Sequence, residues 1–210
     1  MKNYIIEFIG TFFLVFTIGF TSNPIAISAI LTGMIYMGKD ISGAYYNPAI
    51  TIAGWLRGRM NFLEFLKYIA IQILAATIAA LMYYLIIAKT FAPIPNNTIN
   101  PLKPLFIEAA FTFVLALVFL KTTTSKKTAG NSYYGIAIGF TVLGAIYAGS
   151  SISGAGYNPA AAIGSIIIDT IFWGWEGYIH NLWLYIVGPF IGGAAATVVY
   201  KITNPDEFEN

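Results

Sequence analysis

Long apolar segments alternate with short polar loops along the chain. Six of them are interpreted as membrane-spanning helices, each of which needs roughly 20 mostly apolar residues: 4–22, 25–38, 62–88, 103–121, 133–149 and 182–200. Two further apolar stretches, 47–57 and 158–168, are too short to cross, because a helix of about 11 residues rises only about 16 Å. The pattern predicts an all-α integral membrane fold with six transmembrane helices and two re-entrant half-helices.

The composition supports this class. Of the 210 residues, 58% are hydrophobic and 10% are charged, whereas a typical soluble domain is about 25% charged. Such a surface suits membrane lipids and not nucleic acid. The chain has no Cys, which excludes disulfides and thiolate metal sites. With one His and nine Asp and Glu residues it has few groups for acid–base chemistry, so we expect no cofactor and no metal.

Both ends of the chain are open to interpretation. Lys2 precedes an apolar run, as in a secretory signal peptide, but Glu7 interrupts that run and no convincing cleavage site follows it. We therefore interpret residues 4–22 as a retained helix. The polar tail, residues 204–210, is interpreted as a solvated end.

The basic residues predict the orientation. Six spans place both termini on one side of the membrane, and that side receives nine of the 11 Lys and Arg residues: Lys2, Lys39, Arg57, Arg59, Lys67, Lys121, Lys126, Lys127 and Lys201. The other side receives Lys89 and Lys103. Because positive charge concentrates in cytoplasmic loops, we expect a multi-pass protein of the cell membrane with both termini in the cytoplasm.

The two halves of the chain repeat each other. Residues 42–51 read SGAYYNPAIT and residues 153–162 read SGAGYNPAAA, while Glu7 begins EFIGTFFLVF and Glu108 begins EAAFTFVLAL. Each half contains three spans, an odd number, so the halves cross the membrane in opposite directions as an inverted repeat. We expect one domain, residues 1–210, made of a first repeat, 1–90, and a second repeat, 91–210.

The two Asn-Pro-Ala stretches are predicted to begin the half-helices. Asn is a favoured N-cap and Pro is favoured at the first helical position, as in Asn47-Pro48-Ala49 and Asn158-Pro159-Ala160. The inverted repeat brings the two N-termini together near the middle of the membrane. Each carries about half a positive elementary charge, so the pair repels cations, including hydronium. The non-helical Ser-Gly-Ala approaches are tolerated only within protein or beside a water-filled cavity.

Glu7 and Glu108 lie inside predicted spans, where an ionisable group is costly. One interpretation is a proton relay. We favour the other, in which each carboxylate provides hydrogen bonds to the irregular Ser-Gly-Ala backbone, which needs partners.

As a set, these features resemble the aquaporin family (major intrinsic proteins). The resemblance rests on the two SGAxxNPA stretches, the two Glu-led spans and the run GPFIGG at 188–193, and it covers essentially the whole chain. It implies a pore built from six helices and two half-helices, usually assembled as a homotetramer with one pore per subunit. It also implies passive permeation by water or small neutral solutes.

The resemblance assigns an outer selectivity filter to four positions, which here are Ile27, Ile146, Ala155 and Ala161. Water channels of the family usually place an aromatic residue, a His, a small residue and an Arg there. The glycerol-conducting branch usually has an Asp at the position that is Ala162 here. We therefore expect an unusually wide and apolar filter. Width favours permeation, whereas an apolar constriction can lose its water and act as a barrier.

Tyr45 stands two residues before the first motif Asn, where the family often has a His. One interpretation is that it narrows the cytoplasmic vestibule, and the other is that it packs against neighbouring spans.

Three classes of function follow from these features. The preferred one is a passive channel for water and small uncharged solutes such as glycerol, urea or ammonia, which excludes protons and ions. The alternative is a secondary transporter, because inverted repeats with half-helices also occur there. An intramembrane enzyme is disfavoured, because the single His180 lies in a polar loop and no nucleophile with a positioned base is evident.

Overall fold

The computed structural model describes residues 1–175 and 177–208. Six helices in this part of the chain are long and apolar enough to cross a membrane, as predicted: α1 (Lys2–Phe20), α2 (Pro24–Ser42), α4 (Phe62–Ile87), α5 (Leu102–Thr124), α6 (Tyr134–Ser153) and α8 (Leu182–Thr203). Two shorter helices are α3 (Pro48–Leu56) and α7 (Pro159–Trp173), and three 3₁₀ turns are η1 (Lys126–Thr128), η2 (Tyr178–Asn181) and η3 (Pro205–Glu207). No strand occurs among the described residues.

Local signals set the ends of the helices. The Asn23 side chain accepts a hydrogen bond from the Ile25 amide and caps α2, and this helix continues to Ser42, beyond the predicted end at 38. The helix α7 is also longer than predicted and stops where Gly174 adopts φ 87°, a conformation that favours glycine.

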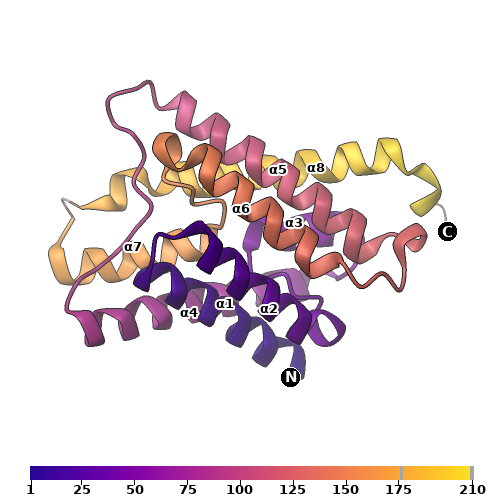
Figure 1. Cartoon of the computed structure of the whole chain (residues 1–210), viewed down its shortest axis with the longest axis horizontal. Helices are drawn as coiled ribbons and strands as arrows, with labels where there is room; N and C mark the ends of the chain where they lie inside the picture. The colour runs from indigo at the N-terminus through magenta and orange to yellow at the C-terminus, as the bar shows by residue number, and fades with distance from the viewer. Residues whose placement is uncertain (176, 209–210) are drawn as a thin grey trace.

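The long helices run obliquely across the molecule, and each chain end lies at the right-hand end of its helix (Figure 1). Around the bundle, α1 packs on α2 and α4, α2 on α6, and α5 on α6 and α8. The half-helix α3 packs on α4 and α8, whereas α7 packs mainly on α4. Each half-helix therefore contacts helices of both halves of the chain.

Small residues allow the half-helices to approach their neighbours. A Cβ atom on Gly193 of α8 would overlap the Ala49 carbonyl oxygen, and one on Gly164 of α7 would lie 2.5 Å from the Ala76 carbonyl carbon. Backbone contact of this kind replaces side-chain interdigitation where helices cross closely in a membrane. The glycines therefore fix the position of both half-helices.

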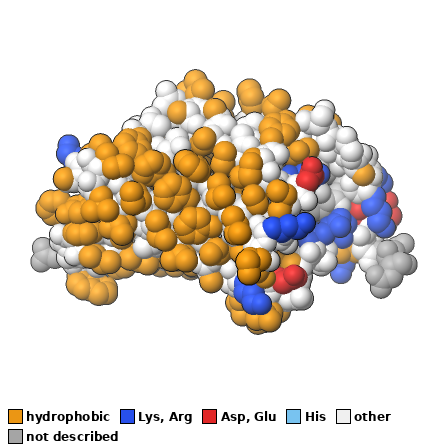
Figure 2. Space-filling model, turned by 90° about the horizontal axis from the view of Figure 1, so that it is seen from below, with side chains coloured by type: hydrophobic (Ala, Val, Ile, Leu, Met, Phe, Trp, Pro, Cys, Tyr) orange, Lys and Arg blue, Asp and Glu red, His pale blue; other side chains and the backbone are white. Residues whose placement is uncertain are grey.

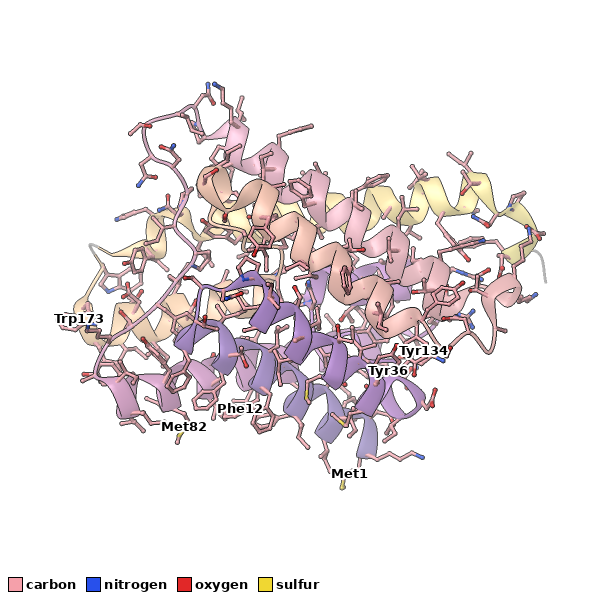
Figure 3. All side chains as sticks on the ribbon, viewed as in Figure 1. Met1, Phe12, Tyr36, Met82, Tyr134 and Trp173 are labelled. Carbon is pink, nitrogen blue, oxygen red and sulfur yellow. The ribbon has the colours of Figure 1, made fainter. Side chains whose placement is uncertain are left out.

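The outer surface suits a lipid environment. Figure 2 shows hydrophobic side chains over most of one face, with basic and acidic side chains gathered toward one end. Tyr36 of α2 and Tyr134 of α6 lie together near that end, with ring centroids 5.1 Å apart, and Trp173 lies at the opposite end (Figure 3). Aromatic residues at both ends of a bundle are typical of the two membrane interfaces.

The prediction of a solvated C-terminal tail is wrong for Asn204, Glu207 and Phe208, whereas Pro205 and Asp206 are exposed. The Glu207 side chain is 1% exposed and pairs with Arg57 at the end of α3 at 3.0 Å. Its Oε1 also accepts hydrogen bonds from the Ser125 hydroxyl (2.6 Å) and the Lys126 amide (2.8 Å). The Phe208 ring lies 4.4 Å from the Arg57 guanidinium. The tail is ordered because one carboxylate satisfies several donors on this face of the molecule.

These contacts predict a pH-dependent stability. The Ser125 hydroxyl, together with the Lys126 and Lys127 amides and Arg57, lowers the pKa of Glu207 from 4.5 to about 2. A depressed carboxylate pKa adds stability above the unfolded value and loses it on acidification. The melting temperature in detergent is therefore expected to fall as the pH decreases from about 4.5 towards 2, and Glu207→Gln is expected to remove that fall.

At neutral pH, Glu207→Gln leaves a buried guanidinium without its counter-charge and is expected to cost about 3 kcal/mol. Asp206→Asn is the matched control. Asp206 pairs with Lys127 at 2.9 Å, but both side chains are more than half exposed, so its removal is expected to cost much less stability than the removal of the Glu207 charge. Equal effects of the two variants would contradict the assigned role of Glu207.

Candidate functional site

The two Asn-Pro-Ala motifs meet, and reciprocal hydrogen bonds join them. Asn47 Oδ1 accepts the Ala49 amide hydrogen at 2.8 Å, and its Nδ2 donates to the Tyr157 carbonyl at 2.8 Å. In the other half, Asn158 Oδ1 accepts from the Ala160 amide and its Nδ2 donates to the Tyr46 carbonyl, both at 3.0 Å. Each Asn therefore begins its own half-helix and binds the residue that precedes the other Asn.

The cross-contact uses only part of the hydrogen-bonding capacity of the two Asn side chains. A carboxamide has two N–H groups, and the cross-contact uses one from each Asn. The side chains of Asn47 and Asn158 are buried and both residues line one cavity between them. One N–H group of each Asn thus remains for a molecule in that cavity.

The backbone that leads to each motif is held in an unusual conformation. Ala44 and Tyr46 have φ values of 54° and 51°, and their counterparts Ala155 and Tyr157 have φ values of 55° and 41°. A left-handed conformation costs roughly 1–2 kcal/mol for a residue other than glycine. Four such residues persist only where the surrounding contacts stabilise them.

Glu7 supplies such contacts in the first half of the chain. The fully buried carboxylate accepts hydrogen bonds from the Ser42 hydroxyl (2.7 Å) and from the amides of Tyr45 (3.0 Å) and Tyr46 (2.8 Å). Gln72 of α4 donates a further bond at 2.9 Å and also contacts the Thr51 hydroxyl. This carboxylate links α1, α4 and the approach to α3.

Glu108 has the equivalent place in the second half. It is fully buried and accepts hydrogen bonds from the amides of Gly156 (2.9 Å) and Tyr157 (2.6 Å). The hydroxyls of Tyr68 and Tyr185 complete the arrangement, because they donate to the carbonyls of Ser42 and Ser153 at 2.9 and 2.6 Å.

Sequence reasoning does not identify three of these residues. A Gln within the apolar segment 62–88 is a detectable signal for Gln72, since a buried amide needs partners. Tyr68 and Tyr185 carry no comparable signal, because an aromatic residue in a span is equally consistent with packing.

Three cavities share wall residues around the place where the half-helices meet. The central cavity has a volume of about 60 Å³ and contains the two Asn side chains in its wall, which gives it room for about four water molecules. The outer cavity has a volume of about 410 Å³. It shares five wall residues with the central cavity, and these five are called the outer neck: Ile18, Ile27, Ile146, Ala155 and Gly156. The inner cavity has a volume of about 230 Å³, and its wall includes Lys39 and Arg59. It shares two wall residues with the central cavity, and these two are called the inner neck: Tyr45 and Phe119.

All four positions assigned to the filter line the outer cavity. Ile27, Ile146 and Ala155 belong to the outer neck, whereas Ala161 lines the outer cavity only. Ile18 joins them from α1, and sequence reasoning does not single it out among the other aliphatic residues of its span. The described linings of the central and outer cavities contain no charged side chain.

Tyr45 packs against residues of neighbouring helices and borders two of the cavities. Its ring packs on Phe119 and Tyr68, with centroid separations of 5.2 and 5.8 Å. It also lines the central and the inner cavities. In the described part of the chain no group of His, Cys, Asp or Glu side chains is arranged to hold a metal ion, and His180 lies in η2.

Comparison with known proteins agrees with this architecture. The family model of the major intrinsic protein (MIP) family matches residues 1–200. Aquaporin NIP1-4 of Oryza sativa subsp. japonica is 30% identical over 211 residues, which cover 93% of this chain and 74% of that protein. Nodulin-26 of Glycine max is 28% identical over 220 residues, which cover 96% and 78%. The solved aquaglyceroporin from Plasmodium falciparum has the same fold, with a TM-score of 0.88, 21% identity and coverage of 98% of both chains.

The chain therefore belongs to the major intrinsic protein family. It is a multi-pass membrane channel of the aquaporin type for water and small solutes, and not an enzyme.

Proposed function

We propose that the protein is a passive channel for water and for small uncharged solutes such as glycerol, urea or ammonia, and that it excludes protons and ions. One observation carries this proposal. Two half-helix N-termini, cross-bonded through Asn47 and Asn158, face a cavity whose described lining has no charged side chain.

The exclusion of protons follows from the charge at the meeting point. Each half-helix begins with about half a positive charge, and the two ends act together on the central cavity. A water molecule there accepts hydrogen bonds from the free Asn47 and Asn158 N–H groups and turns its oxygen towards them. That orientation interrupts a chain of hydrogen bonds, and the same positive ends repel hydronium and metal cations.

Ions of either sign also meet an apolar wall. The side chains of Ile27, Ile146 and Ala155 at the outer neck provide no polar group that replaces the water around an ion, and an unpaired ion in an apolar environment is very costly. A neutral solute loses only a few hydrogen bonds, and the Asn amides and the backbone carbonyls of the two approaches replace part of them.

The outer filter lacks the side chains that would restrict entry to water. At position 161 the side chain is a methyl group, and the adjacent Ala162 is also a methyl group. An Arg there would provide a bulky cation with five N–H donors. We propose that its absence admits solutes larger than water and leaves water permeation modest, because an aliphatic neck is poorly wetted.

The remaining features of the site have supporting roles in this proposal. Glu7 and Glu108 act as loop supports and not as proton relays, because their oxygens are occupied by backbone and side-chain donors. The channel lies in the cell membrane. Its inner cavity and both chain termini face the cytoplasm. The two repeats join within the segment between α4 and α5, and four chains assemble with one pore each.

Proteoliposomes test the proposal directly. In stopped-flow measurements, vesicles that contain the protein are expected to respond faster than empty vesicles to gradients of glycerol, urea or an ammonium salt. The rates are expected to be non-saturable and independent of membrane potential. Equal rates with and without protein for every permeant would contradict the proposal, and potential-dependent uptake would favour a secondary transporter.

The filter assignment predicts the effect of Ala161→Arg. The new guanidinium is expected to narrow the outer mouth and to lower glycerol and urea permeability about tenfold relative to water, since a lost size match of this kind changes discrimination by about 10-fold or more. Ala161→Ser, which adds only a hydroxyl, is the control. A solute profile unchanged by Arg would show that position 161 does not belong to the filter.

A further inference from the structure

The two ends of the central cavity are built from equivalent residues of the two repeats. Aligning Glu7 with Glu108 pairs Leu14 with Leu115, and aligning the SGA motifs pairs Ile27 with Ile138 and Ile35 with Ile146. All six of these side chains line the central cavity. The aliphatic walls of its outer and inner ends are therefore closely matched.

Among the residues of the two necks, the match fails at two positions. The same alignments pair Tyr45 with Gly156 and Phe119 with Ile18. Gly156 and Ile18 belong to the outer neck, whereas Tyr45 and Phe119 are the inner neck. At the inner end, two aromatic rings thus stand where the outer end has a hydrogen atom and a butyl group.

The two rings of the inner neck touch. Their centroids are 5.2 Å apart with planes inclined by 42°, within the range of direct aromatic contact. Tyr45 is 8% exposed and Phe119 is 2% exposed. No solute passes between these rings, so the path from the central to the inner cavity runs along one side of the pair and is narrowed by it.

The neighbours of Tyr45 hold its ring in place. It makes an edge-to-face contact with Tyr68 at 5.8 Å. On the side of α3, a Cβ atom on Gly54 would overlap Tyr45 Cε1, so the ring occupies the space that this glycine leaves open. Because α3, α4 and α5 confine the ring together, the inner neck is a fixed wall.

We propose that Tyr45 and Phe119 form the constriction that sets the upper size limit of the channel. This inference rests on the proposed function and specifies its selectivity. The outer neck admits neutral solutes through an aliphatic opening, and the inner neck rejects those whose carbon skeleton is too long or too branched to pass the two rings. The expected substrates are water and compact solutes of about the size of urea or glycerol, and linear polyols of four or five carbons are excluded.

Variants at the inner neck test this proposal. Tyr45→Gly reproduces Gly156, the equivalent residue of the second repeat. Tyr45→Ala removes the ring without adding backbone freedom, and Phe119→Ala removes the second ring. Permeability to water, glycerol, erythritol and xylitol is measured in proteoliposomes by stopped-flow light scattering, after detergent gel filtration has identified folded variants. Each folded variant is expected to raise the xylitol-to-glycerol permeability ratio about tenfold, which corresponds to the loss of a modest steric barrier.

Two controls distinguish widening of the inner neck from a general loosening of the bundle and from widening of the outer neck. Phe13→Ala removes a ring of α1 that is 44% exposed on the outer surface and is expected to leave the ratio unchanged. Ile27→Ala enlarges the outer neck and is expected to change total flux without changing the ratio.

Each outcome decides a specific point. An unchanged ratio in the inner-neck variants, or an equal increase with Ile27→Ala, overturns the assignment of the size limit to Tyr45 and Phe119. If the variants show this result while the wild-type protein conducts water and glycerol, the proposed channel function still holds. A wild-type protein that conducts none of the four permeants overturns the channel function and the size limit together.

Discussion

The reciprocal hydrogen bonds of Asn47 and Asn158 are the interaction on which the rest of the structure depends. Each amide caps one half-helix and donates to the backbone just before the other motif. Two electropositive helix ends are thereby held face to face. The glutamates, the left-handed residues of the approaches and the glycines behind each half-helix all serve to keep this contact in place.

The constraint explains why so apolar a chain retains buried polar groups. Backbone outside a regular helix has N–H groups that lipid does not satisfy, and Glu7 and Glu108 provide acceptors for them. The first and last carbonyls of each approach accept hydrogen bonds from tyrosine and asparagine side chains, and the carbonyls between them belong to residues such as Ala44, Tyr45, Ala155 and Gly156, which line the central cavity. One set of contacts therefore both stabilises the fold and provides the polar side of the pore.

Much of this arrangement could be predicted from the sequence because the repeat is explicit. The paired Asn-Pro-Ala motifs predicted the half-helices, and the odd number of spans in each half predicted their meeting. Residues that act through shape could not be predicted in the same way. Ile18 and Phe119 resemble any lipid-facing side chain in sequence, and only the fold shows that they border the cavities. The ordered tail depends on Glu207 reaching Arg57, 150 positions away, a pairing that local polarity does not reveal.

The central claim is that two facing helix ends admit neutral molecules and reject protons, and paired flux measurements test it most directly. Water permeability and proton conductance are measured in the same proteoliposomes, the first by light scattering under an osmotic gradient and the second with an enclosed pH-sensitive dye under a pH gradient with valinomycin. The account predicts faster water flux than in empty vesicles and no added proton conductance. Proton conductance that rises together with water flux would contradict it.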